Sequence, residues 1–175
     1  MRIACAPQTF VAFMFLKWAS SVHYIPERTL VSYVNEKYAY NGSANIRRYD
    51  RKSPYYYNIQ AGIRHTWGNN ITVHMLFFEY QHNQYRRSFV ELHLKLCDML
   101  QRDPYFGKIF SMVLAKYKIA CPVPAGMYVF RNITLPSEGI PNILPFEKGK
   151  VEVNISQLPT QDLITTIYVW FHIKQ

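Results

Sequence analysis

The sequence lacks the residue patterns that mark the common kinds of catalytic and metal site. Neither an H-E-x-x-H nor a G-x-S-x-G pattern occurs in its 175 residues, and its six histidines are scattered. No pair of His or Cys residues stands at the spacing of a zinc site. We therefore expect no catalytic residue, no metal and no cofactor, and we expect the protein not to be an enzyme.

Acidic residues are few, at 11 against 20 Lys and Arg, and the formal net charge is +9. Such an excess suits nucleic acid, anionic lipid headgroups or simple solubility. Part of it clusters at residues 47–52, with Arg47, Arg48, Arg51 and Lys52. This cluster is either a headgroup-binding patch or the charge that protects an exposed edge strand.

Long apolar runs are scarce, and the clearest one, at residues 10–16, is too short to cross a bilayer as a helix. With Arg2 before it and the small residues Ala19 and Ser21 after it, this run matches a secretory signal peptide covering residues 1–21. The alternative is an uncleaved anchor. Cleavage removes Arg2 and Lys17, so the net charge falls from +9 to +7. Residues 22–175 then form one secreted, extracellular domain with no nucleic-acid partner and no stable membrane insertion.

Cysteine is scarce too, and of the three residues Cys5 lies in the predicted signal peptide. Cys97 and Cys121 remain, an even number in an oxidising compartment, which predicts one disulfide. Four N-glycosylation sequons agree with secretion. They begin at Asn41, Asn70, Asn132 and Asn154.

Aromatic residues are plentiful, with 14 Tyr and 11 Phe, which favours strands. Alternating apolar residues predict strands over 30–40, 44–51, 55–64, 71–80, 127–135, 149–156 and 162–174. The Asn41-Gly42 pair predicts a tight hairpin between the first two. About seven short strands indicate an immunoglobulin-like antiparallel β-sandwich in a mainly β chain.

One stretch, at about 92–118, is predicted to be a helical insertion in this sandwich. Six apolar residues there recur at helical spacing: Phe106, Ile109, Phe110, Val113, Leu114 and Tyr117. Asp103 suits the N-cap of this helix and Pro104 its first turn. A shorter helix over 92–101 precedes it.

Two strands carry apolar faces that we expect to point between the sheets. These faces hold Val73, Met75 and Phe77 on one strand and Ile167, Val169 and Phe171 on the other. If the gap between the sheets holds a ligand, these six residues line it. If the gap is packed, they are ordinary core.

The motifs around the two cysteines resemble those of a known family. An L-C-D-x-L pattern at 96–100, C-P at 121–122 and P-x-x-x-G at 145–149 are similar to the insect secreted proteins of the DUF1091 group. That group includes the chemosensory protein A and B families, which are related to MD-2-type lipid-recognition domains. The resemblance extends from about residue 31 to the C-terminus, and it implies a cavity between the sheets of the sandwich.

The resemblance further implies a role in binding or presenting lipid-like cues, in the detection of pheromones or contact cues. We therefore expect an extracellular protein that binds a small apolar or amphipathic ligand, with a cell-surface receptor as a further partner. The alternative is an extracellular protein–protein interaction domain with a solid core and no small ligand. A dry cavity of roughly 300 Å³ or more favours the first, and an exposed apolar patch favours the second.

Overall fold

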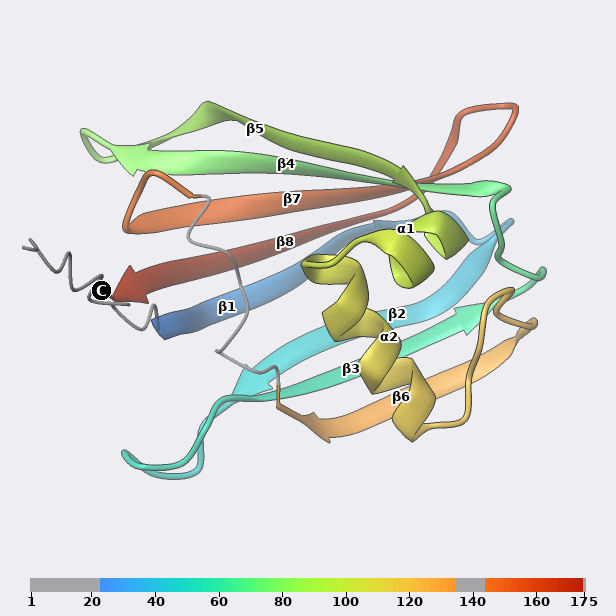
Figure 1. Ribbon diagram of the computed structural model, residues 1–175, viewed down its shortest axis with the longest axis horizontal. Helices are drawn as coiled ribbons and strands as arrows, with labels where there is room; N and C mark the ends of the chain where they lie inside the picture. The colour runs from blue at the N-terminus through green and yellow to red at the C-terminus, as the bar shows by residue number, and fades with distance from the viewer. Residues whose placement is uncertain (1–22, 135–143, 175) are drawn as a thin grey trace, which may run out of the picture.

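The computed structural model describes residues 23–134 and 144–174, which form two antiparallel sheets and two helices (Figure 1). The predicted signal peptide lies outside these residues. The strands are β1 (His23–Val34), β2 (Ala39–Arg47), β3 (Tyr56–Ile63), β4 (Ile71–Gln81), β5 (Gln84–Lys95), β6 (Gly126–Ile133), β7 (Lys148–Gln157) and β8 (Asp162–Lys174). Helices α1 (Leu96–Arg102) and α2 (Phe106–Lys116) come between β5 and β6.

Five strands form a large sheet in the order β1-β8-β7-β4-β5, and three form a small sheet in the order β2-β3-β6. The chain passes directly from β1 of one sheet to β2 of the other, and both helices lie on the same side of the sheets (Figure 1). The prediction of a mainly β sandwich with one helical insertion is therefore confirmed. Within the described ranges, no helix is both long enough and apolar enough to span a membrane.

Strand β5 is an eighth strand, where the sequence predicts a polar connection followed by a helix from residue 92. Val90, Leu92 and Leu94 are more buried than Glu91 and His93 between them, so apolar and polar residues alternate as in a half-buried strand. Along most of its length β5 pairs with β4. The helical insertion consequently begins at the start of α1, because the preceding residues complete the sheet.

The hairpin predicted at Asn41-Gly42 is wrong. Both residues lie inside β2, where the register with β3 shifts and Asn41 has a φ of 51°. Asn and Gly tolerate this conformation, so the pair forms a bulge instead of a turn. The chain turns earlier, at Asn35, whose carbonyl accepts the N–H of Tyr38 at 3.0 Å and whose side chain accepts the N–H of Lys37 at 3.1 Å.

The larger core lies between the large sheet and the helices. We call the face of this sheet that carries Val73, Met75 and Phe77 its inner face. Met99 and Leu100 of α1 are buried against it, which places the helical insertion over β4 and its neighbours. The buried members of this core are Val73, Met75, Phe77, Met99, Leu100, Leu144, Phe146, Phe171 and Ile173.

Side chains outside the helices satisfy their first backbone N–H groups. The Asn69 side chain, from the turn before β4, accepts the N–H of Cys97 at 3.0 Å and of Asp98 at 3.2 Å. The prediction of Asp103 as the N-cap of α2 and of Pro104 in its first turn is wrong, because α2 begins at Phe106 and its N-cap is Tyr105. From two residues before that cap, the Asp103 carboxylate still accepts the N–H of Gly107 at 2.7 Å. These bonds fix both helix starts, where free N–H groups would otherwise be left unpaired.

Gly107→Ala is expected to destabilise the protein, because the two helices touch at this glycine. A Cβ atom at Gly107 would lie 1.8 Å from the backbone oxygen of Met99 and 2.9 Å from Cβ of Asp103. Backbone cannot move aside cheaply, so we expect a loss of about 1–3 kcal/mol despite the better helix propensity of Ala. Urea unfolding of the two proteins measures the difference.

Gly68→Ala is the matched control. A Cβ atom there would meet Pro122 at 3.4 Å, which is ordinary contact. Its unfolding midpoint should stay close to that of the wild type. Equal stability of the Gly107→Ala variant and this control would contradict the close approach of α1 and α2.

Candidate ligand-binding site

The six residues predicted to line a ligand lie on one face of the large sheet, but they fall into two groups. Val73, Met75, Phe77 and Phe171 are at most 4% exposed and belong to the larger core. Ile167 and Val169 are only half-buried. The prediction that these residues share one face is correct, but other residues bury this face at Phe171 more completely than at Ile167 and Val169.

Adjacent strands continue these two half-buried positions across the sheet. Ile167 lies opposite Val153 of β7, and Val169 lies opposite Val151. Paired residues of antiparallel strands point to the same side, so a continuous apolar surface crosses the sheet from β4 to β8. The helices and the segment containing Phe146 cover its β4 side more completely than the middle of β8.

The opposite wall comes from the small sheet, and the sequence analysis did not identify it. Its apolar residues alternate with the exposed outer residues of β2 and with polar positions of β3. They are Ala44 and Ile46 on β2, Tyr57, Ile59 and Ala61 on β3, and Tyr128 and Phe130 on β6. All of them are half-buried except Tyr57, which is buried. The alternation of Tyr57, Ile59 and Ala61 was visible in the sequence.

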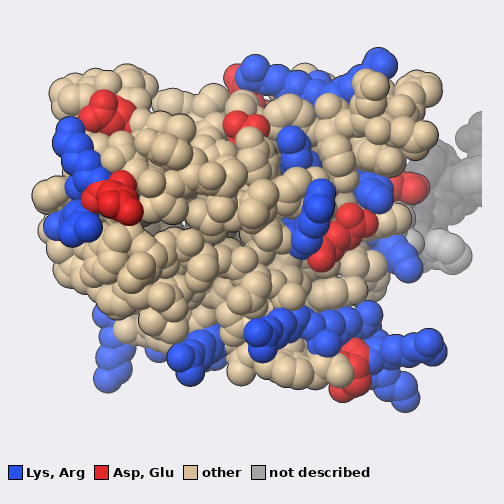
Figure 2. Space-filling model, turned by 180° about the vertical axis from the view of Figure 1, so that it is seen from behind, with Lys and Arg blue, Asp and Glu red and all other residues tan. Residues whose placement is uncertain are grey.

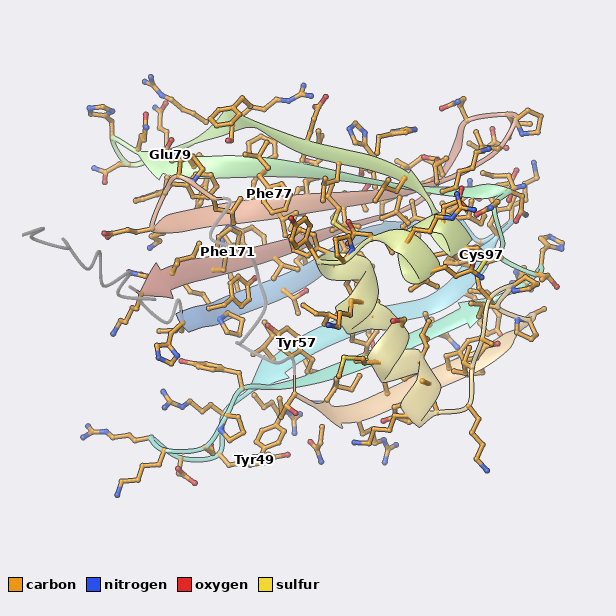
Figure 3. The ribbon with its side chains drawn as sticks, in the orientation of Figure 1. Tyr49, Tyr57, Phe77, Glu79, Cys97 and Phe171 are labelled. Atoms are coloured by element: carbon orange, nitrogen blue, oxygen red, sulfur yellow. A yellow bond between two sulfur atoms is a disulfide. The ribbon has the colours of Figure 1, made fainter. Side chains whose placement is uncertain are left out.

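Helix α2 contacts both walls. Phe106 packs on Phe77 of the large sheet with ring centroids 5.8 Å apart, and Tyr117, just after the helix, packs on Phe130 of the small sheet at 4.8 Å. The helix therefore bridges the sheets on the side that faces the viewer in Figure 1. In Figure 3, Phe77 and Phe171 come from the large sheet and Tyr57 comes from the small sheet below them.

Apolar residues on both walls keep accessible surface although they lie between two sheets. Ile167 and Val169 on one side, and Ile59, Ala61 and Phe130 on the other, are all half-buried. Close-packed interiors leave few such surfaces. We call the region that these five residues border the inter-sheet space.

Two tyrosines lie between the sheets. Tyr24 of β1 packs on Phe171, with ring centroids 5.1 Å apart, and Tyr57 is buried on the inner face of β3. Burial raises the pKa of Tyr24 well above its ordinary value and also raises the pKa of Tyr57. Both groups therefore remain neutral hydrogen-bond donors at neutral pH.

A groove of about 350 Å³ lies elsewhere, on the outer face of the small sheet. It is lined by Ser43, Asn45, Arg47, Tyr49, Asn58, Ile59, Gln60, Val129, Phe130, Arg131 and Asn132. Figure 2 shows this side of the molecule, with Lys and Arg gathered along the lower edge. The groove is mostly polar and is not the dry cavity predicted between the sheets. Of the predicted basic cluster, only Arg47 lies in the edge strand β2, and Arg48, Arg51 and Lys52 lie in the connection between β2 and β3.

The predicted disulfide between Cys97 and Cys121 is present, with Cα atoms 5.6 Å apart. Shortly after it, Val123 exchanges two backbone hydrogen bonds with Trp67, at 2.7 and 2.8 Å. The bridge and this pair together hold the end of the helical insertion against the connection between β3 and β4.

The four sequons differ in how their side chains are placed. Asn41 and Asn132 are exposed. The amide of Asn70 is bonded to the backbone of its own turn. Asn154 lies on the outer face of β7, as its alternation predicts, but it is half-buried, and its amide donates to Glu152 at 2.9 Å. Glycosylation of all four remains a prediction.

Within the described residues, no group of three His, Cys, Asp or Glu side chains is arranged to hold a metal ion. His74 and His93 form a cross-strand aromatic pair with centroids 5.1 Å apart, and Glu91 lies 4.0 Å from His74. All three are on the outer face of the large sheet and partly open to solvent.

Comparison with known families gives one match in sequence. The family described as a protein of unknown function, DUF1091, matches residues 73–150. The chain is similar to DUF1091 over this segment. The matched segment runs from the inner-face residues of β4 through both helices to the start of β7. No curated protein matches the sequence.

Among solved structures, the chain is similar to chicken MD-1, crystallised in complex with lipid IVa. The TM-score is 0.40 and the sequence identity is 10%, with 86% of this chain and 96% of that chain covered. The grouping with insect chemosensory proteins, expected from the motifs, remains a prediction.

Proposed function

We propose that this protein is an extracellular, non-enzymatic binding protein whose small apolar or amphipathic ligand occupies the inter-sheet space. The observation that carries this proposal is the half-burial of apolar residues on the faces of both sheets that point towards each other. A hydrocarbon chain placed there gains about 0.8 kcal/mol for each buried CH₂ group. About ten such groups supply the roughly 8 kcal/mol that corresponds to micromolar binding.

The extracellular setting rests on the disulfide and the sequons. Disulfides such as Cys97–Cys121 persist in oxidising compartments, and three of the four sequon asparagines, Asn41, Asn70 and Asn132, are exposed. The finer role that we propose is the detection of lipid-like chemical cues, with a cell-surface receptor receiving the loaded protein.

A second function, an interaction domain without a small ligand, is favoured by exposed apolar side chains. Phe89 is 84% exposed on β5, and Leu30 and Tyr33 are exposed on β1. Both strands are edges of the large sheet. Apolar residues at sheet edges are places where another protein can dock.

Val169→Trp should separate the two functions. If the inter-sheet space is open, the indole fills it, so uptake of a fluorescent fatty-acid analogue is lost while the melting temperature stays near that of the wild type. Fluorescence titration and thermal unfolding of the secreted protein measure the two effects. A clear drop in melting temperature, combined with no uptake by the wild type, would rule out the ligand-binding function.

Val73→Trp is the matched control, since Val73 is 4% exposed in the larger core. Added bulk there has no room, and overpacking should cost about 1–3 kcal/mol. Equal stability of the two Trp variants would show that Val169 and Val73 are packed alike. Mass spectrometry of a lipid extract from the secreted protein would then identify what, if anything, is bound.

A further inference from the structure

Two tyrosine hydroxyls at the inter-sheet space take part in no hydrogen bond within the described residues. They belong to Tyr24 of β1 and Tyr57 of β3, and Tyr57 is only 8% exposed. Every fully buried polar side-chain atom in the described ranges has a hydrogen-bond partner. Both side chains lie on the faces that point between the sheets, because Tyr24 lies opposite Ile173 of β8 and Tyr57 lies opposite Ile46 of β2.

The hydroxyls of two other tyrosines near this space already donate hydrogen bonds to backbone carbonyls. Tyr128 donates to the carbonyl of Pro124 at 2.7 Å, and Tyr117 donates to the carbonyl of Arg131 at 3.4 Å. Tyr24 and Tyr57 thus have hydroxyls that form no hydrogen bond with another described residue, and both rings lie between the sheets, Tyr24 against Phe171 and Tyr57 buried on the inner face of β3. Burying a phenol hydroxyl without a hydrogen-bond partner costs free energy unless a ligand or a water molecule accepts its hydrogen bond.

The walls around these hydroxyls are almost uncharged. The alternation of β7, β8, β2, β3 and β6 places apolar residues, Thr or Gly on the faces that point between the sheets. Glu79 continues the inner face of β4 at the same end of the molecule as Tyr57 (Figure 3). It lies opposite Gly149, which in turn lies opposite Phe171, and Arg86 of β5 lies opposite Glu79 on its other side. No Lys or Arg side chain of β2, β3, β4, β6, β7 or β8 shares the inner faces within the described residues.

We propose that the ligand's polar end is an uncharged hydrogen-bond acceptor, such as an alcohol, ester or ketone, held by Tyr24 and Tyr57. This inference rests on the proposed function. A carboxylate entering this site would leave water without meeting a positive charge, which is strongly unfavourable. A neutral acceptor needs one donor, and the two phenols supply two. The protein therefore favours long-chain alcohols, esters or ketones over fatty acids.

Displacement of the apolar dye N-phenyl-1-naphthylamine tests this. The competitors are hexadecanol, methyl hexadecanoate and hexadecanoate, used at about pH 8, where the acid is ionised. We expect the alcohol and the ester to displace the dye at concentrations roughly tenfold or more below that of the acid. Tyr57→Phe should weaken the alcohol and the ester about threefold to tenfold relative to the dye affinity of the same variant, the size of one neutral hydrogen bond.

Tyr80→Phe is the matched control, because Tyr80 lies on the outer face of β4, away from the inter-sheet space, and its hydroxyl donates to the Asn83 side chain at 3.4 Å. It should leave the affinities for all three competitors unchanged. Equal affinity for acid and alcohol, or no effect of Tyr57→Phe, overturns this inference while the proposed function stands. Absence of dye binding by the wild type overturns both.

Discussion

Phe171→Ala is expected to cost about 3–5 kcal/mol of unfolding free energy, the range for removing a fully buried aromatic ring. Phe171 is 1% exposed and lies between two other rings, with centroids 5.1 Å from Tyr24 and 6.2 Å from Phe146. Its partner across the sheet, Gly149, leaves no side chain that could move into the vacated space. The melting temperature should fall by roughly 6–20 °C.

Urea unfolding and thermal unfolding of the secreted protein measure this loss. Phe89→Ala is the matched control, because it removes the same side chain from a position that is 84% exposed. Its stability should stay within about 0.5 kcal/mol of the wild type. A Phe171→Ala variant as stable as this control would mean that Phe171 lines an open space and is not part of the core.

Much of the fold follows from alternation in the sequence. On β8, Ile167, Val169 and Phe171 alternate with Tyr168 and Trp170, and the structure keeps this division from Ile167 to Phe171. The period of two is a direct consequence of strand geometry. It therefore identifies the strand and its faces without any knowledge of its neighbours.

The errors arise where local preference and tertiary pairing disagree. Leu92, His93 and Leu94 are residues that a helix accepts as readily as a strand, and a helix does follow them. Pairing with β4 makes these residues a strand, and that pairing cannot be predicted from the local sequence. The Asn41-Gly42 pair fails for a similar reason, because a bulge and a hairpin turn need the same backbone conformation.

The candidate site could be predicted only in part. Alternation correctly places Val73 and Phe171 on one face, but it cannot say that α1 and the segment containing Phe146 cover them. Coverage depends on contacts between segments far apart in the sequence. For the same reason, the free hydroxyl of Tyr57 could be found only once the hydrogen bonds of its neighbours were known.

Removal of the disulfide is expected to cost on the order of 3–4 kcal/mol. The bond joins residues separated by 24 positions in the sequence, and closing a loop of that length restricts the unfolded chain by about this amount. In the folded protein it holds α1 next to the paired residues Trp67 and Val123. Its loss therefore frees the end of the helical insertion that covers the larger core.

The double variant Cys97→Ser/Cys121→Ser should unfold at a clearly lower urea concentration than the oxidised wild type. The wild type in the presence of dithiothreitol should show the same shift, and the variant should not respond to dithiothreitol. Because α2 bridges the two walls of the inter-sheet space, dye binding should weaken together with stability. An unchanged midpoint on reduction would show that the bridge does not stabilise the fold, and peptide mapping without reductant would establish whether the two cysteines are linked at all.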